Sequence, residues 1–523
     1  MKAWHFQIAN CSVSVLRRDQ MTTPRPAVIA FDGVFTYDDL DVASRRVASA
    51  LLGGRADLDQ DRVAFLVPPS CAYVAVQRGI WRAGGVAVPL AVSHPPAELE
   101  YVVGDSGATT VVAHQMFAET AALVARATGA RSLTTSDALQ MSPVEATPHI
   151  GSPRRAMIVY TSGTTGRPKG AVTTHANIGA QIASLVSAWG WTPHDRLLLV
   201  LPLHHVHGII NGLGCALAVR ATCEMPPSFD PEQVWQRLAS GEITVFTAVP
   251  AIYHRLIASW DTASPELQRE RSAGVRRVRL MMSGSAALPV QTLERWREIS
   301  GHTLLERYGM TEIGMALSNP VDGTRRPGSV GRPLPGVDVR LVDEHGAAVP
   351  DGSPGELEVR GPTVFLEYWN RPQETKAAFR DGWFRTGDVA IVEDGSYRLL
   401  GRTSVDIIKT GGFKVSALEI EEVLRTHPAI AECAVVGLHD PDWGERVAAA
   451  VELQDGALLS LAELQQWAKT LLAPYKIPRA LTTVTALPRN AMGKVVKGEV
   501  VELFGSDPES QNPKTQIPSP KSQ

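Results

Sequence analysis

One stretch of the sequence, at positions 160–170, has residue types that suit the binding of phosphate. It reads YTSGTTGRPKG and combines hydroxyl side chains, glycines and two cations. The apolar run 156–159 before it predicts a buried strand, and residues 174–177 after it predict the start of a helix. A glycine-rich loop between a strand and a helix lets backbone N–H groups approach phosphate oxygens, while hydroxyls and a cation add donors. The stretch therefore predicts a phosphate-binding loop.

The loop differs from the Walker pattern at two positions. That pattern needs a glycine directly before its lysine and a hydroxyl residue directly after it. Here Pro168 precedes Lys169 and Gly170 follows it. The kinase and GTPase interpretation is therefore poor. By composition alone, a surface loop rich in serine, threonine and glycine remains an alternative.

A second block, ERYGMTE at 306–312, supplies what a nucleotide would need beyond its phosphates. The Tyr308 ring can stack on a purine. The Thr311 hydroxyl can bond an α-phosphate oxygen. The Glu312 carboxylate is a hard ligand for the Mg²⁺ that accompanies ATP. Taken alone, the block also fits an ordinary turn.

Two later blocks add an acid, a guanidinium and a lysine. WFRTGD at 383–388 ends in Asp388, and an ionised carboxylate accepts hydrogen bonds well from two ribose hydroxyls. Arg402 follows in a Gly-Arg pair. LPRNAMGK at 487–494 ends in Lys494, whose charge could neutralise a reacting carboxylate and an α-phosphate. The alternatives are a turn aspartate, a surface ion pair and a solvated lysine.

These four blocks, in this order, resemble those of the adenylate-forming superfamily of acyl-CoA synthetases, adenylation domains and luciferases. The resemblance covers residues 25–504. It implies that a carboxylate attacks the α-phosphorus of MgATP to give an acyl-adenylate and pyrophosphate, after which a thiol, usually coenzyme A, displaces AMP. It also implies that a small domain rotates between the two half-reactions about a hinge at Ser404, where the family usually has Asp or Lys.

The resemblance carries roles over to individual residues. The nucleotide contacts it implies are Thr161, Ser162, Gly163, Thr164, Thr165, Gly166, Lys169, Glu306, Arg307, Tyr308, Asp388, Arg402 and Lys494. Thr165 and Glu312 would bind Mg²⁺, and Gly411, Gly412, Phe413 and Lys414 would approach CoA. The catalytic set it implies is His207, Thr311, Glu312 and Lys494.

Finer features resemble the malonyl-CoA synthetase branch, notably GRTSVDIIKTGGFKVSALE at 401–419 and RPGSVGRPLPGV at 326–337. A dicarboxylate site needs a partner for the carboxylate that does not react, because an unpaired buried charge is costly. By resemblance Arg255 and Arg307 would hold that group with bidentate geometry. The pocket would be completed by His207, Ser283, Ser285 and Met310.

Three alternatives to malonate ligation remain. The substrate could be another short or aryl acid, or the acyl acceptor could be a carrier-protein thiol acting in trans. A nucleotide-binding pseudoenzyme is the third, but Lys494, Glu312 and Asp388 are all present. The three histidines at 204, 205 and 207 could suggest a metal, but no fourth ligand is evident.

The surrounding elements predict an α/β protein. Strands alternate with helices up to about residue 328, which indicates parallel sheets covered on both faces. Short strands separated by Gly/Pro/Asp turns follow. We expect a large N-terminal domain of two doubly wound α/β subdomains plus a small β-barrel, and a small mobile α+β C-terminal domain. The expected boundaries are 25–400 for the first domain, 401–405 for the hinge and 406–504 for the lid.

Composition excludes several classes of protein. The chain has 523 residues and a net charge of -3, so no basic excess exists to bind nucleic acid. No apolar run approaches the roughly 20 residues that span a bilayer. Five scattered cysteines suggest a reducing compartment. We expect a cytoplasmic protein with an N-terminal extension at 1–24 and a disordered tail at 505–523. If residues 1–20 are a transit peptide, the mitochondrial matrix is the alternative.

Overall fold

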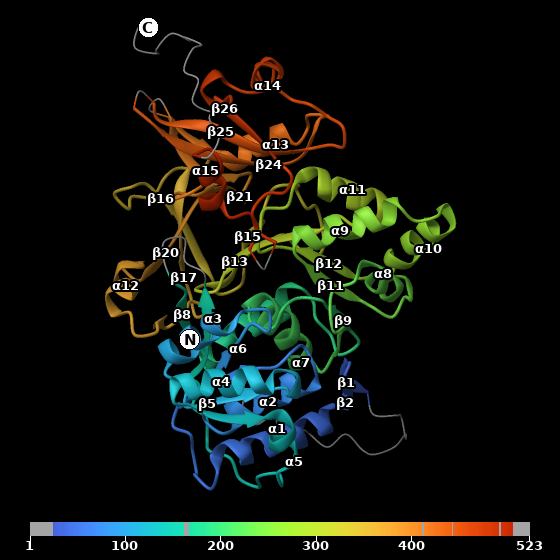
Figure 1. The fold of residues 1–523 in the computed structure, drawn as a ribbon, viewed down its shortest axis with the longest axis vertical. Helices are drawn as coiled ribbons and strands as arrows, with labels where there is room; N and C mark the ends of the chain where they lie inside the picture. The colour runs from blue at the N-terminus through green and yellow to red at the C-terminus, as the bar shows by residue number, and fades with distance from the viewer. Residues whose placement is uncertain (1–24, 162–166, 411–412, 442, 491–492, 506–523) are drawn as a thin grey trace. The chain divides into compact units, whose positions relative to one another are not determined.

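The computed structural model describes residues 25–161, 167–410, 413–441, 443–490 and 493–505. The chain forms two compact units (Figure 1). The first unit comprises the chain as far as Arg326, together with Gly331–Asp338 and Val359–Phe384. The second comprises Pro327–Val330, Val339–Glu358 and the chain from Arg385 onward. No helix among the described residues is long and apolar enough to cross a membrane.

The first unit contains a seven-stranded sheet with the strand order β18-β8-β7-β4-β3-β5-β6. Its strands are β3 (Arg62–Leu66), β4 (Val86–Pro89), β5 (Thr110–Ala113), β6 (Arg131–Thr134), β7 (Arg155–Thr161), β8 (Lys169–Thr174) and β18 (Glu367–Tyr368). Strands β3 to β7 pair in parallel, whereas β8 is antiparallel to both β7 and β18.

Helices cover both faces of this sheet. They are α1 (Tyr37–Leu52), α2 (Cys71–Arg82), α3 (Pro96–Ser106), η1 (Gln115–Phe117), α4 (Ala118–Thr128) and α5 (Thr135–Gln140). Ala64 and Leu66 of β3 pack with apolar residues of α3 and α4. On the other face Phe65 contacts Tyr73 of α2, with ring centroids 5.1 Å apart. The side chains of a strand alternate between its two faces, so β3 is apolar on both faces from Val63 to Leu66.

A nine-stranded sheet forms the rest of the first unit, in the order β15-β14-β13-β12-β11-β9-β10-β1-β2. Its strands are β1 (Pro26–Ala30), β2 (Gly33–Thr36), β9 (Arg196–Leu199), β10 (Thr222–Met225), β11 (Val245–Ala248), β12 (Leu280–Ser283), β13 (Leu305–Met310), β14 (Gly314–Ser318) and β15 (Arg332–Pro333). The six neighbouring strands β13, β12, β11, β9, β10 and β1 all pair in parallel.

One face of this sheet packs on four helices, which Figure 1 shows together in green. They are α8 (Pro231–Ala239), α9 (Pro250–Asp261), α10 (Pro265–Val275) and α11 (Val290–Ser300). Their core includes Trp235, Tyr253 and Trp296, all fully buried. The unit also contains α6 (His175–Ala188), α7 (Cys215–Ala218) and α12 (Pro372–Ala377), and β19 (Phe379–Arg380) pairs with the start of β20.

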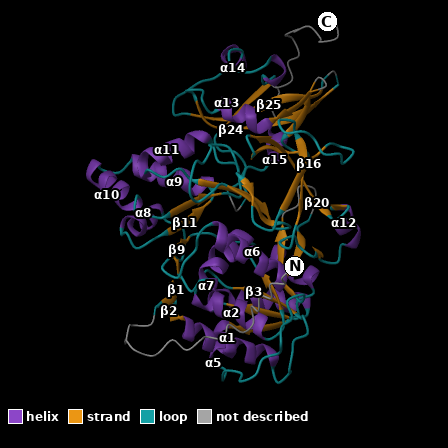
Figure 2. Ribbon diagram, turned by 180° about the vertical axis from the view of Figure 1, so that it is seen from behind, coloured by secondary structure: helices purple, strands orange, loops and turns teal. Residues whose placement is uncertain are grey.

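The second unit is built on two groups of paired strands, drawn in orange in Figure 2. Strands β16 (Asp338–Val342), β17 (Gly355–Arg360), β20 (Trp383–Glu393) and β21 (Ser396–Arg402) neighbour one another in that order. A second sheet has β22 (Ile407–Thr410), β23 (Phe413–Ser416), β24 (Ile430–Asp440), β25 (Gly444–Leu453) and β26 (Ala480–Val484). Its helices are α13 (Ala417–Leu424), α14 (Leu461–Ala468), η3 (Pro474–Lys476) and α15 (Lys497–Leu503).

Strand β24 carries two apolar faces. Cys433 and Val435 pack in the core with α13 and α14, whereas Ala434 and Val436 pack with α15. This gives the α+β arrangement expected for the end of the chain. The domain boundaries and the hinge at 401–405 stay a prediction, because packing alone does not locate a hinge.

Two local predictions differ from the structure. The phosphate loop was expected between a strand and a helix, but it joins β7 to β8, and α6 begins only after β8. The expectation is wrong because residues 169–174 pair with β7 before the Thr174 capping box starts the helix. The sequence of residues 208–219 also predicts a helix, and in the structure this helix begins as a π-helix, η2 (His207–Gly214), before α7. Hydrophobic periodicity does not separate these two helix types.

Candidate functional site

A group of buried polar side chains lies where adjacent parallel strands of the nine-stranded sheet end. Thr247 is in β11, Ser283 ends β12, and Arg307 is in β13. His207 joins them from the start of η2. Ligands of open α/β sheets bind outside the carboxyl ends of the strands. The topology therefore places these side chains where such a fold binds its ligand.

His207 connects the members of this group. Its Nδ1 lies 2.9 Å from Ser285 Oγ, and its Nε2 lies 2.8 Å from Thr247 Oγ1. The Arg307 guanidinium donates from Nη2 to His207 Nε2, and the same nitrogen lies 3.3 Å from Thr247 Oγ1. Because Nε2 accepts from a cation, the ring proton belongs on Nδ1, which donates to Ser285. The imidazole therefore holds Arg307 on one side and the serine on the other.

The protonation states of the pair follow from their burial. Burial holds the pKa of His207 well below its ordinary value, and the charges of Arg307 and His205 lower it further. Burial also lowers the pKa of Arg307 to about 10. At neutral pH the site thus contains a neutral imidazole beside a buried cation. No carboxylate forms an ion pair with Arg307 among the described residues.

The backbone around Ser285 is shaped to admit the guanidinium. A Cβ at Gly284 would lie 2.0 Å from Arg307 Nη1, so only glycine fits there. Ser285 itself has a positive φ of 69°, a conformation that is uncommon outside glycine and that marks functional turns. Within the described chain, Ser283 Oγ and Arg307 Nε are buried without a hydrogen-bond partner. Both atoms are thus available to a ligand group.

The 306–312 block forms the end of β13 and its turn into β14. Glu306 and Tyr308 are buried, and Met310 and Thr311 are half-buried. The buried Glu312 carboxylate accepts a hydrogen bond from the Tyr368 hydroxyl at 2.9 Å. A single carboxylate fits Mg²⁺, which usually takes one or two protein carboxylates and completes its shell with phosphate oxygens and water.

Tyr368 also contacts the phosphate-loop lysine. Lys169 Nζ lies 5.4 Å from the centre of the Tyr368 ring and forms an ion pair with Glu374. Strand β18, which carries Tyr368, pairs with β8, which begins at Lys169. The structure therefore links Lys169 and Glu312 through one aromatic side chain.

Helix α3 holds both ends of the phosphate loop. Asp105 accepts a hydrogen bond from the Tyr160 hydroxyl at 2.7 Å, directly before Thr161. The Tyr101 hydroxyl donates to the Pro168 carbonyl at 2.8 Å. The predicted contacts Ser162, Gly163, Thr164, Thr165 and Gly166 lie outside the described residues. The described flanks nevertheless show a loop fixed at its two ends.

Arg255 stands apart from the His207 group in its contacts. It lies on α9, its side chain is exposed, and its guanidinium lies 4.6 Å from the centre of the Phe229 ring. Among the described residues it makes no hydrogen bond and no ion pair. Its predicted role in holding a carboxylate stays a prediction.

The remaining predicted residues belong to the second unit. Arg402 Nε donates to Asp388 Oδ1 at 2.9 Å, so the two candidate ribose contacts are one ion pair. Lys494 is exposed. The exposed Phe413 ring stacks on Tyr475 at 4.2 Å beside the exposed Lys414, and Gly411 and Gly412 lie outside the described residues.

Comparison with known proteins identifies the family. Residues 16–369 match the AMP-binding enzyme model, and residues 419–494 match the AMP-binding enzyme C-terminal domain. The chain belongs to the AMP-binding enzyme family. It is 48% identical to a mitochondrial malonate–CoA ligase (ACSF3) of Homo sapiens, over 94% of this chain and 92% of that protein. It is 43% identical to a malonate–CoA ligase of Arabidopsis thaliana, over 91% and 86%.

A solved structure of the same family shares the fold. The ATP-bound MatB of Rhodopseudomonas palustris superposes with a TM-score of 0.86 at 37% identity, covering 93% of this chain and 97% of that one. The expected α/β architecture and the resemblance to adenylate-forming enzymes are therefore confirmed.

Three residues of this AMP-binding enzyme contact the predicted site although no motif indicated them. Thr247 contacts His207, Tyr368 contacts Glu312, and Asp105 fixes Tyr160. Thr247 gave a weak signal, as a polar residue near the end of an apolar strand. Tyr368 and Asp105 gave none, since their partners lie 56 and 55 residues away in the sequence.

Proposed function

We propose that this enzyme joins malonate to coenzyme A in an ATP-dependent reaction that forms AMP. One malonate carboxylate attacks the α-phosphorus of ATP, which gives malonyl-adenylate and pyrophosphate. The CoA thiol, after losing its proton, attacks the acyl carbon, and AMP leaves. The relatives named malonate–CoA ligase support this reaction, and the buried Arg307 is the observation on the molecule that carries it.

Arg307 is suited to the carboxylate of malonate that does not react. A buried cation without a carboxylate partner is costly, and an anionic ligand removes that cost. The guanidinium can bind a carboxylate with two parallel hydrogen bonds. His207 and Thr247 hold its Nη2 edge, which leaves the unpartnered Nε for the ligand. A monocarboxylate such as acetate would leave the cation unpaired.

His207 serves this site as a holder of Arg307 and Ser285. Its depressed pKa keeps it neutral, so it adds no charge to the pocket. We expect Ser283, Ser285 and Met310 to line the acid, with methylmalonate as a second substrate. Arg255, exposed over Phe229, is a second proposed contact for the distal carboxylate.

We also assign residues of the chain to the parts of ATP. We assign the β- and γ-phosphates to the loop from Thr161 to Lys169, the adenine to Tyr308 and the ribose to Asp388 and Arg402. In this assignment Glu312 would hold Mg²⁺, which neutralises charge on the phosphates when bound. Lys494 would stabilise negative charge at the reacting carboxylate and the α-phosphate. CoA would approach Phe413 and Lys414.

Localisation is a separate proposal. Cytoplasmic location was the first expectation, and a mitochondrial matrix location was the alternative. The names of the vertebrate relatives include "mitochondrial", which supports the alternative. Cell fractionation of the tagged full chain distinguishes the two.

A substrate panel tests the proposed reaction. The substrates are malonate, methylmalonate, acetate, octanoate and benzoate. The pyrophosphate released with each acid is measured by a coupled colour reaction. We expect malonate to have the highest kcat/KM and methylmalonate to follow. A higher kcat/KM for acetate, octanoate or benzoate would contradict the dicarboxylate assignment. Replacing CoA by an acyl carrier protein tests the alternative acceptor.

A further inference from the structure

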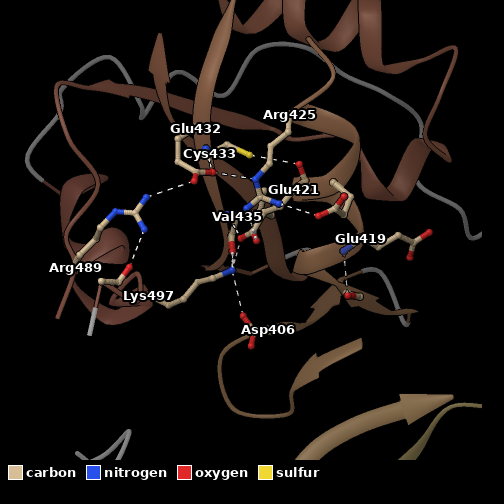
Figure 3. Close-up of polar contacts among 12 residues, drawn as sticks. Asp406, Glu419, Glu421, Arg425, Glu432, Cys433, Val435, Arg489 and Lys497 are labelled. Atoms are coloured by element: carbon tan, nitrogen blue, oxygen red, sulfur yellow. Dashed lines mark hydrogen bonds and ion pairs between the residues drawn. The ribbon is translucent and has the colours of Figure 1, made fainter. Parts of the chain in front are cut away.

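A cluster of buried ions in the second unit has no part in the chemistry assigned so far (Figure 3). At its centre is Lys497, the first residue of α15, whose side chain is 13% exposed. Lys497 Nζ donates to Glu421 Oε1 on α13 and, at 2.6 Å, to the Val435 carbonyl on β24. Its third partner is Asp406 Oδ1, at 3.2 Å. One ammonium group thus joins three segments that are far apart in the sequence.

Asp406 carries this connection to the turn after β21. Its second oxygen, Oδ2, accepts a hydrogen bond from the Arg402 backbone N–H at 3.0 Å. The Asp406 N–H in turn donates to the Arg402 carbonyl at 2.8 Å. Gly401 allows this close approach, since a Cβ there would lie 2.3 Å from the Asp406 Cβ. Arg402 is the residue that pairs with Asp388.

The other end of the connection is the loop that carries Lys494, three residues before Lys497. The Lys494 N–H donates to Asn490 Oδ1 at 3.0 Å, and its carbonyl accepts from the Asn490 N–H at 2.9 Å. The Val496 N–H donates to the Pro488 carbonyl at 2.9 Å. These bonds close the loop on itself. Its orientation therefore depends on the residues that tie its ends to the rest of the unit.

The ties include a cation at each end of the loop, together with the Leu487 N–H, which donates to Glu452 Oε1 at 2.7 Å. Lys497 fixes the end that follows Lys494, and Arg489 fixes the start through Glu432 at 3.4 Å. Figure 3 shows Arg489 reaching Glu432 and Lys497 reaching Asp406 from the same side of the cluster. The Lys497 side chain is 13% exposed and has three partners, whereas the Arg489 side chain is 35% exposed. Lys497 is therefore the stronger anchor.

We propose that Lys497 is a positioning residue, which fixes the Lys494 loop to the turn that carries Arg402. The proposal rests on the roles assigned above to Lys494 and Arg402. A continuous set of contacts runs from Asp388 through Arg402 and Asp406 to Lys497. In the conformation of this structure it connects the candidate ribose contacts to the segment that carries Lys494. A lysine misplaced by about 1 Å can cost on the order of a hundredfold in rate.

Stability alone does not account for this cluster. Apolar residues of similar volume often stabilise a protein as well as a buried ion pair does. A cation between two carboxylates does something that an apolar contact does not do, because it fixes which segments meet and in what register. Both carboxylates, Asp406 and Glu421, lie outside the Lys494 loop and belong to different segments.

A double-mutant cycle tests the proposal. Lys497→Met, Lys494→Ala and the double variant are compared by malonate-dependent exchange of pyrophosphate into ATP. We expect Lys497→Met to lower the exchange rate about 10- to 100-fold with little change in the malonate KM. In the Lys494→Ala background the same change should have no further effect, because the residue it positions is gone. Lys497→Arg should recover part of the rate.

Lys469→Met is the matched control, since Lys469 is an exposed lysine of the same unit that contacts only Gln466 among the described residues. If Lys497→Met fails to fold, Asp406→Asn replaces it, because this change leaves the Lys497–Glu421 pair intact. Amide hydrogen exchange at 493–496 should rise in either variant. An equal fractional loss in both Lys494 backgrounds, or an unchanged rate, would overturn the proposal.

Failure of the proposed function would look different. A wild-type enzyme without malonate-dependent exchange would refute malonate ligation and leave the positioning proposal to be tested with the acid that does support exchange.

Discussion

Each unit contains a cation with little exposure to solvent. Carboxylates of the protein neutralise the charge of one of these cations but not that of the other. Arg307 in the first unit contacts a neutral imidazole and a hydroxyl, and among the described residues it forms no ion pair with a carboxylate. Lys497 in the second unit lies between Glu421 and Asp406. A buried cation that the protein neutralises itself acts on structure. One that it leaves without a carboxylate is ready for an anionic ligand. The difference supports the two proposed roles, which are substrate binding for Arg307 and positioning for Lys497.

The largest expected effect is the loss of malonate turnover on replacing Arg307. We expect Arg307→Met to lower kcat/KM for malonate by about 10²- to 10⁴-fold, which corresponds to the roughly 3–5 kcal/mol lost when one partner of a buried charge pair is removed. Acetate has no second carboxylate, so its kcat/KM should change far less. Arg269→Met, at an exposed arginine of α10, is the control. Equal losses for the two acids would contradict the comparison.

In the second unit, we expect loss of a charge partner to change the stability of the protein. Glu421→Gln removes one carboxylate from Lys497 and leaves Asp406 in place. We expect the free energy of unfolding, measured in urea, to fall by about 1–3 kcal/mol. Arg307→Met should not lower it, because that change removes a desolvated charge. A lower free energy of unfolding in Arg307→Met, together with an unchanged one in Glu421→Gln, would contradict the contrast between the two cations.

The buried histidines near Arg307 should make the stability of the protein depend on pH. Burial lowers the pKa of His204 to about 3 and of His205 to about 4, and it holds that of His207 well below its ordinary value. The unfolded chain binds protons at these residues near pH 6.5, but the folded chain does not. Stability is thus fully present above pH 6.5 and decreases as the pH falls below it.

Each such histidine should contribute a slope of about 1.4 kcal/mol per pH unit below pH 6.5. His207→Gln should reduce the measured slope by about that amount, determined by chemical unfolding at pH 6.0 and 5.0. An unchanged slope would show that His207 is already protonated in the folded site.

The smallest expected effect concerns Tyr368. Tyr368→Phe removes one hydrogen bond to the Glu312 carboxylate, worth about 1 kcal/mol. We expect the KM for MgATP to rise about fivefold while the malonate KM stays near the wild-type value. Tyr37→Phe, which removes a hydroxyl bonded to the Ala221 carbonyl, is the control. A shift in the malonate KM instead would place Tyr368 at the acid.

The sequence predicted the parts of the site that follow from a motif and the fold that follows from periodicity. The 306–312 block gave Arg307 and Glu312 as candidates, and the alternation of strands and helices predicted parallel sheets covered by helices on both faces. It did not predict Thr247, Tyr368 or Asp406, because each acts through a partner that only the sheet order or a turn brings near. The strand expected to lead into a helix at the phosphate loop leads into β8, because strand pairing is a tertiary property.

The central claim is that Arg307 is the receptor for the distal carboxylate of the substrate, and malonate binding tests it most directly. Calorimetric titration of malonate into wild type and Arg307→Met, each saturated with a non-hydrolysable ATP analogue, measures that contact without catalysis. We predict a binding isotherm for the wild type and an affinity at least about a hundredfold weaker for the variant, at unchanged unfolding free energy. Equal malonate affinity in the two proteins would contradict the account.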